Sequence, residues 1–68
     1  MITRNDEGLF FTYRLDNQLH RPNGPAKIDW CANWSWWLYG KRHRYYGPAL
    51  SWAGKNWYIK GDWVKYEG

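Results

Sequence analysis

The residues most able to carry chemistry lie in a short motif that occurs twice. The pattern His-Arg-x-x-Gly-Pro-Ala begins at His20 and begins again at His43, 23 residues later. An imidazole can transfer protons or bind a metal, and a guanidinium binds carboxylates and phosphates through a fork of N–H donors. The motif is therefore either a ligand site that is used twice or one structural unit that is built twice.

The other reactive residues do not support a catalytic or metal site. The chain has two histidines and one cysteine, Cys31, and these give no spaced pair of metal ligands. The six carboxylates lie mostly at expected turns or near the termini, and the glycines mark turns rather than a phosphate-binding loop. We expect no enzymatic activity, no cofactor and no metal, and we interpret Cys31 as a buried or incidental thiol.

Length and charge limit what the chain can be. Sixty-eight residues make a single small domain, 1–68, whose seven Trp, six Tyr and two Phe supply much of the apolar area. A lone cysteine fits a reducing compartment, so we expect a cytoplasmic protein. No apolar run resembles a signal peptide or is long enough to span a membrane. The net charge of +4 favours an acidic partner.

The motif is part of a longer repeat. Asn-Trp at 33–34 recurs at 56–57 with the same shift of 23, and the segment 36–40 is echoed at 57–61 with a shift of 21. Repeats of about this length are supersecondary units that stack on their neighbours. The expected units span about 9–33, 34–56 and 57–68.

Each unit has the composition of a β-hairpin. Aromatic and β-branched residues favour strands, and Asp-Asn, Gly-Lys and Gly-Asp pairs between them favour tight turns. The sequence predicts an all-β fold, an antiparallel β-hairpin meander of about six short strands with turns near Asn17, Gly40 and Gly61. Gly-Pro at 24–25 and 47–48 is expected to form the corner between one hairpin and the next strand.

The repeated pattern resembles the MORN-repeat family, whose units carry Tyr/Trp-x-x-Gly turns and stack as antiparallel hairpins. It is more similar to a variant in which His-Arg-x-x-Gly-Pro-Ala replaces His-Gly-x-Gly, as in small proteins of bacteriophages and other large DNA viruses. The resemblance covers roughly residues 9–68. It implies a binding or spacing module, and the missing glycines of His-Gly-x-Gly leave no lipid-binding role to carry over.

Side-chain alternation predicts two different faces. With turn residues at 17–18, 40–41 and 61–62, alternate residues point to opposite sides of the sheet. One face is aromatic and aliphatic and is expected to form the buried core. Its members are Phe11, Tyr13, Leu15, His20, Pro22, Trp34, Trp36, Leu38, His43, Tyr45, Trp57, Ile59, Val64 and Tyr66. The two histidines on it are expected to be structural, bonded to a backbone carbonyl or to a tyrosine.

The opposite face is basic and aromatic, and it is the predicted binding surface. Exposed aromatic rings in a row mark binding surfaces, and Trp, Tyr and Arg dominate interface hot spots. The expected partner-binding residues are Trp37, Tyr39, Arg42, Arg44, Tyr58, Lys60, Trp63 and Lys65.

These observations predict a non-enzymatic protein-binding module. With the resemblance, the expected role is a small phage accessory protein that docks on a host protein in the host cytoplasm, and that either inhibits it or is sensed by a host defence system. The alternative is a single-stranded nucleic-acid-binding protein whose rings stack bases while its cations follow the phosphates. Open sheet edges are also expected, and they offer pairing with a partner or with a second copy.

Overall fold

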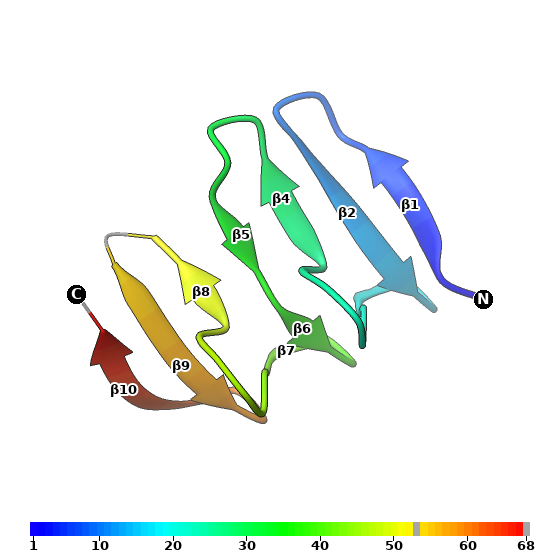
Figure 1. Ribbon diagram of the computed structural model, residues 1–68. Helices are drawn as coiled ribbons and strands as arrows, with labels where there is room; N and C mark the ends of the chain where they lie inside the picture. The colour runs from blue at the N-terminus through cyan, green and yellow to red at the C-terminus, as the bar shows by residue number, and fades with distance from the viewer. Residues whose placement is uncertain (53, 68) are drawn as a thin grey trace.

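The structure is a computed structural model that describes residues 1–52 and 54–67. The described chain forms ten short strands. They are β1 (Thr3–Asp6), β2 (Phe10–Leu15), β3 (Gln18–Leu19), β4 (Lys27–Asp29), β5 (Trp34–Ser35), β6 (Trp37–Leu38), β7 (Lys41–Arg42), β8 (Leu50–Ser51), β9 (Lys55–Ile59) and β10 (Asp62–Glu67). The first strand, β1, lies at one end of the row of strands and the last strand, β10, at the other (Figure 1).

The strands form one main antiparallel sheet. Its order is β1-β2-β4-β5-β8-β9-β10, with β3 beside β2, while β6 and β7 form a separate two-stranded hairpin. Every strand pairing in the described part of the chain is antiparallel, and these residues contain no helix. The all-β antiparallel hairpin fold predicted from the sequence is confirmed, but the described residues form ten short strands instead of about six.

The three tight turns share one backbone geometry. Both central residues have positive φ at Asp16-Asn17 (48° and 69°), Tyr39-Gly40 (49° and 79°) and Lys60-Gly61 (50° and 89°), which is the signature of a type I′ turn. The predicted turns are confirmed in place, but their central pair begins one residue earlier than expected. Pairing partners therefore shift, and Trp37 pairs with Arg42 rather than with the residue two positions further on.

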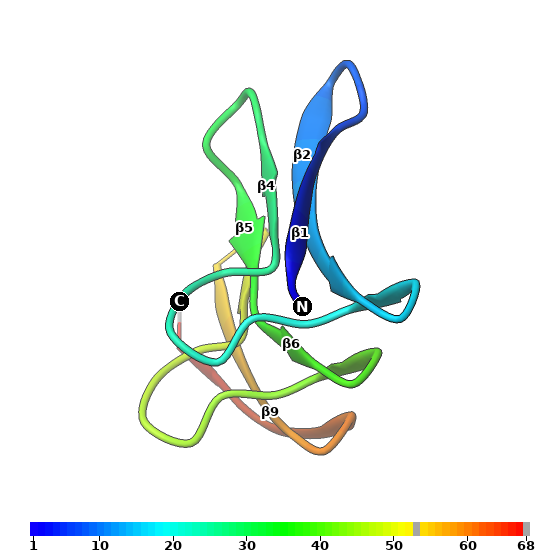
Figure 2. The same cartoon turned by 90° about the vertical axis from the view of Figure 1, so that its right-hand side faces the viewer.

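Successive hairpins stack through equivalent backbone hydrogen bonds. The N–H of Gly40 donates to the carbonyl of Leu19 at 2.9 Å, and the N–H of Gly61 donates to the carbonyl of Arg42 at 2.8 Å. Each donor closes a tight turn, and each acceptor lies in the hairpin before it. Figure 2 shows the result, with the tight turns stacked on one side and the Gly-Pro loops on the other.

The buried residues of the described chain all come in pairs that are related by the shift of 23. The pairs are Thr12 and Ser35, His20 and His43, Gly24 and Gly47, and Ala26 and Ala49. No large apolar side chain is buried among the described residues, and the largest fully buried side chain is that of Thr12. Close packing in this protein is therefore made by the repeated motif and not by a conventional aromatic core.

The expected division into a core face and a solvent face is wrong. Trp36 and Trp57, assigned to the core, are half-buried, and so is Trp37 on the opposite face. Tyr45 and Tyr66, also assigned to the core, are 62% and 54% exposed. A sheet with no second layer packed against it cannot bury either face completely, so both faces present aromatic rings to solvent.

A β-bulge changes the last hairpin. The pairing of β9 with β10 runs from Tyr58 opposite Trp63 to Trp57 opposite Lys65, so Val64 is the extra residue. Because a bulge shifts the alternation by one position, Lys65 lies on the side of Trp57 and not on the predicted outer face. Val64 was expected to fill the space of a core histidine, and it is instead 48% exposed.

The two outermost strands carry features that oppose edge-to-edge pairing. β1 has four residues, all exposed, and includes Arg4 and Asp6. β10 contains the bulge, a lysine near its centre and the carboxylates Asp62 and Glu67 at its ends. Short strands, bulges and edge charges are the usual protections of an exposed sheet edge, so the broad faces are the better candidates for binding.

Candidate functional site

The two histidines of the motif join each hairpin to the next. His20 Nδ1 accepts a hydrogen bond of 3.0 Å from the backbone N–H of Tyr39, and His43 Nδ1 accepts one of 2.9 Å from that of Lys60. Tyr39 packs its ring against His20, and Tyr45 packs edge-on against His43, both at 4.3 Å between ring centroids. The predicted structural role is supported, but the partner expected for each ring was wrong. Nδ1 of each ring accepts instead from a backbone amide of the following hairpin.

The arginine of the motif closes its own loop. Arg44 donates from Nη1 to the carbonyl of Pro48 at 3.2 Å, and its guanidinium lies over the ring of Trp36 at 4.1 Å and against Gly47. The first copy repeats these contacts, with Arg21 bonded to Pro25 at 3.2 Å, over Tyr13 at 4.0 Å and against Gly24. His-Arg-x-x-Gly-Pro-Ala is therefore one structural unit that is built twice.

Four of the predicted binding residues do not lie on the surface that the other four share. Arg44 closes its loop, and Lys65 covers the ring of Trp57 at 4.3 Å at the equivalent position of the last hairpin. Tyr39 and Lys60 are the first central residues of two tight turns. Alternation failed at Arg44 because the chain leaves the strand after β7, at Tyr39 and Lys60 because both lie in turns, and at Lys65 because of the bulge in β10.

The other four predicted residues form one cluster, here called the Arg42 cluster. Trp37 pairs with Arg42 in one hairpin, and Tyr58 pairs with Trp63 in the next. The Arg42 guanidinium bridges the two hairpins, because it lies 5.1 Å from the ring of Trp37 and 5.4 Å from the ring of Tyr58. Residues of two sequence units thus meet on one face of the sheet.

Two polar side chains next to the cluster orient its indoles through hydrogen bonds. Trp37 Nε1 donates to Ser35 Oγ at 2.7 Å, and Trp63 Nε1 donates to Asn56 Oδ1 at 3.2 Å. Ser35 and Asn56 occupy repeat-equivalent positions, and Thr12 is their counterpart in the first unit. Hydrogen-bonded tryptophans lose little further freedom when a partner binds, which favours their use as anchors.

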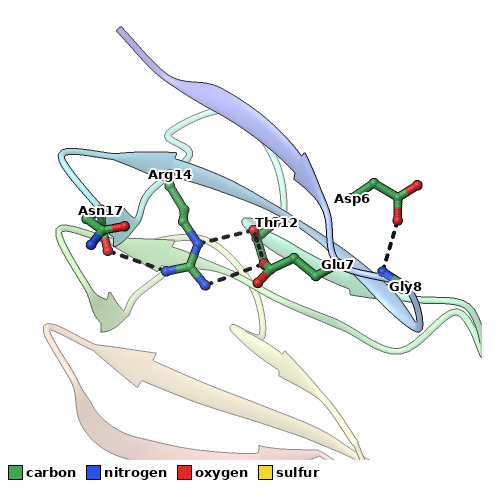
Figure 3. Close-up of polar contacts among 6 residues, drawn as sticks. All are labelled: Asp6, Glu7, Gly8, Thr12, Arg14 and Asn17. Atoms are coloured by element: carbon green, nitrogen blue, oxygen red, sulfur yellow. Dashed lines mark hydrogen bonds and ion pairs between the residues drawn. The ribbon is translucent and has the colours of Figure 1, made fainter.

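Arg42 has no hydrogen-bond acceptor of its own among the described residues, and its Nε is buried without a partner. Arg14 on the same face shows the contrast (Figure 3). Arg14 reaches Glu7 Oε2 at 3.5 Å, Thr12 Oγ1 at 3.3 Å and the carbonyl of Asn17 at 3.4 Å. Arg14 therefore has acceptors within the described chain, whereas the Nε of Arg42 has none.

Glu7 is the carboxylate that completes the Arg14 network. Its pKa lies below the usual 4.5, chiefly because the Thr12 hydroxyl donates a 2.6 Å hydrogen bond to it and also because of the charge of Arg14. A carboxylate with a lowered pKa in the folded protein stabilises the fold above its unfolded-state pKa. That contribution is lost as the pH falls through the folded-state pKa.

We therefore expect Glu7→Gln to lower the melting temperature slightly at pH 7 and to have no effect at a pH well below 4. Melting curves of both proteins at a series of pH values test this. Asp16→Asn is the control, because Asp16 lies in a tight turn and makes no ion pair among the described residues. A deficit of Glu7→Gln that stays constant down to pH 3 would contradict the assignment.

A groove of about 230 Å³ adjoins the Arg42 cluster between β4, β5 and β8. Sequence reasoning missed its walls, which include Lys27, Asp29, Leu50 and Trp52. These residues are related in pairs by the shift of 23, so the repeat alignment itself contained a signal for them. Trp52 is 65% exposed, and Arg42 lines the same groove.

The comparisons with known proteins found no relative. No protein-family model, no curated protein and no solved structure matches this chain. The case for a function therefore depends on the chain's own geometry.

Cations dominate that geometry. Guanidinium or ammonium groups lie over aromatic rings at Arg4, Arg21, Lys27, Arg42, Arg44 and Lys65. Within the described residues, the ion pair of Arg14 with Glu7 is the only one. The sheet thus presents positive charge that its own carboxylates do not neutralise.

Other sites receive little support. Residues 1–52 and 54–67 hold no group of three or more His, Cys, Asp or Glu side chains that could bind a metal. They also contain no helix with the length and apolar character needed to cross a membrane. Cys31 is exposed and lies in the turn after β4, so the buried alternative for its thiol is wrong.

Proposed function

We propose that this protein is a non-enzymatic module that binds an acidic surface of a protein partner through the Arg42 cluster. The observation that carries the proposal is Arg42, whose guanidinium lies over the rings of Trp37 and Tyr58 and forms no ion pair with a described carboxylate. Aromatic residues around an arginine are the usual composition of an interface hot spot. The Cα extents of 30 × 24 Å suit a surface of roughly 800 Å², which is what one partner contributes to a standard interface.

Single-stranded nucleic acid remains the alternative, and the ring geometry favours it less. Base stacking requires free ring faces. Arg42 covers a face of Trp37 and of Tyr58, and other cations cover Trp36 and Trp57 in the same way. A partner can then reach only the edges of these rings and the cations that lie over them. Carboxylates and apolar side chains fit such a surface better than stacked bases do.

The motif suggests where the partner is found. Its resemblance to MORN-like proteins of bacteriophages makes a host protein the partner that we propose. Binding would then inhibit that host protein, or would be the event that a host defence system senses.

Capture from bacterial lysate tests the proposal. We expect the immobilised protein to retain a host protein after nuclease treatment, and Trp63→Ala to lose most of that capture. Trp63 is 57% exposed, so its removal takes away a binding side chain with little effect on folding. Truncation of a hot-spot residue costs about 2 kcal/mol or more of binding free energy, which is roughly a 30-fold loss of affinity.

Tyr46→Ala is the matched control. Tyr46 is an aromatic residue that is 92% exposed, but it lies in a Gly-Pro loop and outside the Arg42 cluster. We expect this variant to capture as well as the unmodified protein. Capture that Trp63→Ala leaves intact would reject the cluster as the site, and capture that nuclease abolishes would favour nucleic acid.

A further inference from the structure

The position of Arg42 in the repeat shows that the fold does not need a charge there. The shift of 23 relates Arg42 to Leu19, and the shift of 21 relates it to Trp63. Both counterparts are apolar. Each lies in a strand, as the second residue after the central pair of a tight turn. The repeated architecture therefore does not require a charge at this position, although the Arg42 side chain also packs against the rings of Trp37 and Tyr58.

The surroundings of Arg42 leave its charge uncompensated. The side chain is half-buried between two aromatic rings, and no described carboxylate lies within salt-bridge distance of it. A partly desolvated guanidinium with unused N–H donors gains most from a charged acceptor that it can bind with two parallel hydrogen bonds. A carboxylate matches that fork.

The groove next to Arg42 supplies the rest of a recognition site. Trp37, Leu50 and Trp52 form apolar walls, and Lys27 adds a second cation. A segment with an acidic residue beside an aliphatic one would place the carboxylate on Arg42 and the aliphatic side chain between the indoles.

We infer that this groove binds an extended acidic-aliphatic peptide segment of the partner, with Arg42 as the receptor for a Glu or Asp carboxylate. The inference rests on the proposed function and specifies the chemistry of the contact. The ring faces beneath Arg42 are not free to stack bases, which favours a peptide over a nucleic acid.

A titration followed by NMR tests the inference with defined probes. The probes are a capped Leu-Glu-Leu-Glu-Leu peptide, its isostere with Gln in place of Glu, and a thymidine hexanucleotide. The buried Nε–H of Arg42 and the indole N–H groups of Trp37 and Trp52 report directly on the groove. We expect saturable shifts of these signals with the Glu peptide, and an affinity for the Gln peptide that is lower by about tenfold or more.

Arg42→Leu is the decisive variant, because Leu is the residue that the first unit carries at this position. We expect it to fold and to bind the Glu and Gln peptides equally weakly. Arg42→Lys keeps the charge but not the fork, and it should recover only part of the preference for Glu. If Arg42→Leu has the same melting temperature as the unmodified protein, its loss of binding is not caused by a loss of folding.

The opposing results are equally definite. Equal affinity for the Glu and Gln peptides, shifts confined to residues outside the groove, or no saturable shift with the Glu peptide would each overturn the inference. Shifts produced by the hexanucleotide alone would overturn it in favour of nucleic acid. If nuclease-resistant capture of a lysate protein depends on Trp63 but not on Arg42, the proposed function stands and this inference falls.

Discussion

Gly47→Ala is expected to destabilise the protein by about 1–3 kcal/mol from backbone strain alone. Gly47 has φ of 144°, a conformation that side-chain-bearing residues rarely adopt. An added Cβ would also lie 2.8 Å from Arg44 Cζ, so the guanidinium would have to leave its place over Trp36. A chain of this length has a total stability of roughly 3–10 kcal/mol, so the loss should be plain in urea unfolding followed by tryptophan fluorescence.

The repeat supplies a matched comparison for that variant. Gly24 is equally close to its arginine, because an added Cβ would lie 2.9 Å from Arg21 Cζ, but its φ is not in the strained positive range. Gly24→Ala should therefore cost less than Gly47→Ala. When Gly47→Ala is made in an Arg44→Ala protein, the added Cβ no longer meets the guanidinium. The loss of stability that remains then comes from the backbone strain. An equal, small effect at both glycines would contradict the role given to φ.

His43→Ala is expected to cost roughly 2–4 kcal/mol, from the cavity it leaves and from the lost bond to the next hairpin. His43 is 5% exposed, and its Nδ1 is the acceptor for the backbone N–H of Lys60 at 2.9 Å. The hydrogen bond joins the β6–β7 hairpin to the β9–β10 hairpin. We expect the last hairpin to lose protection in amide hydrogen exchange before the rest of the sheet does.

Two conservative variants separate the hydrogen bond from simple packing. In His43→Asn the side-chain oxygen stands near the position of Nδ1, whereas in His43→Gln the oxygen stands near that of Nε2. We expect Asn to retain more stability than Gln, because only Asn keeps an acceptor for the Lys60 amide. His20→Ala should behave as His43→Ala does, since its Nδ1 accepts from Tyr39 at 3.0 Å. A variant of either histidine that melts like the unmodified protein would reject the joining role.

Local features of the fold could be predicted without coordinates. Turn residues fix backbone geometry within a few positions, so the turns near Asn17, Gly40 and Gly61 were placed to within one residue. The fold class followed from strand propensity and the spacing of those turns. Every buried residue of the described chain belongs to a pair related by the repeat, as His20 and His43 do, so self-comparison of the sequence already contained the packing pattern.

The candidate site was predicted in part. Trp37, Arg42, Tyr58 and Trp63 were expected to share a surface. Strand pairing joins them two by two, and the Arg42 guanidinium, which lies over both Trp37 and Tyr58, connects the two pairs. Arg44 was expected beside them, but it lies against Gly47 because the chain leaves the strand and folds back in the Gly-Pro loop. Alternation carries no information once a strand has ended.

The remaining features depend on contacts that form only in the folded chain. Lys65 changes sides because one extra residue, Val64, enters β10, and no propensity marks where such a bulge occurs. Each motif histidine accepts a hydrogen bond from a backbone N–H far along the chain, 19 residues away for His20 and 17 for His43. These bonds therefore depend on how the hairpins stack. The repeated unit and its turns could be recognised without coordinates, because they depend on residues that are neighbours along the chain. The buried, unpartnered Nε of Arg42 and the groove beside it depend on contacts between units, and only the folded sheet could show them.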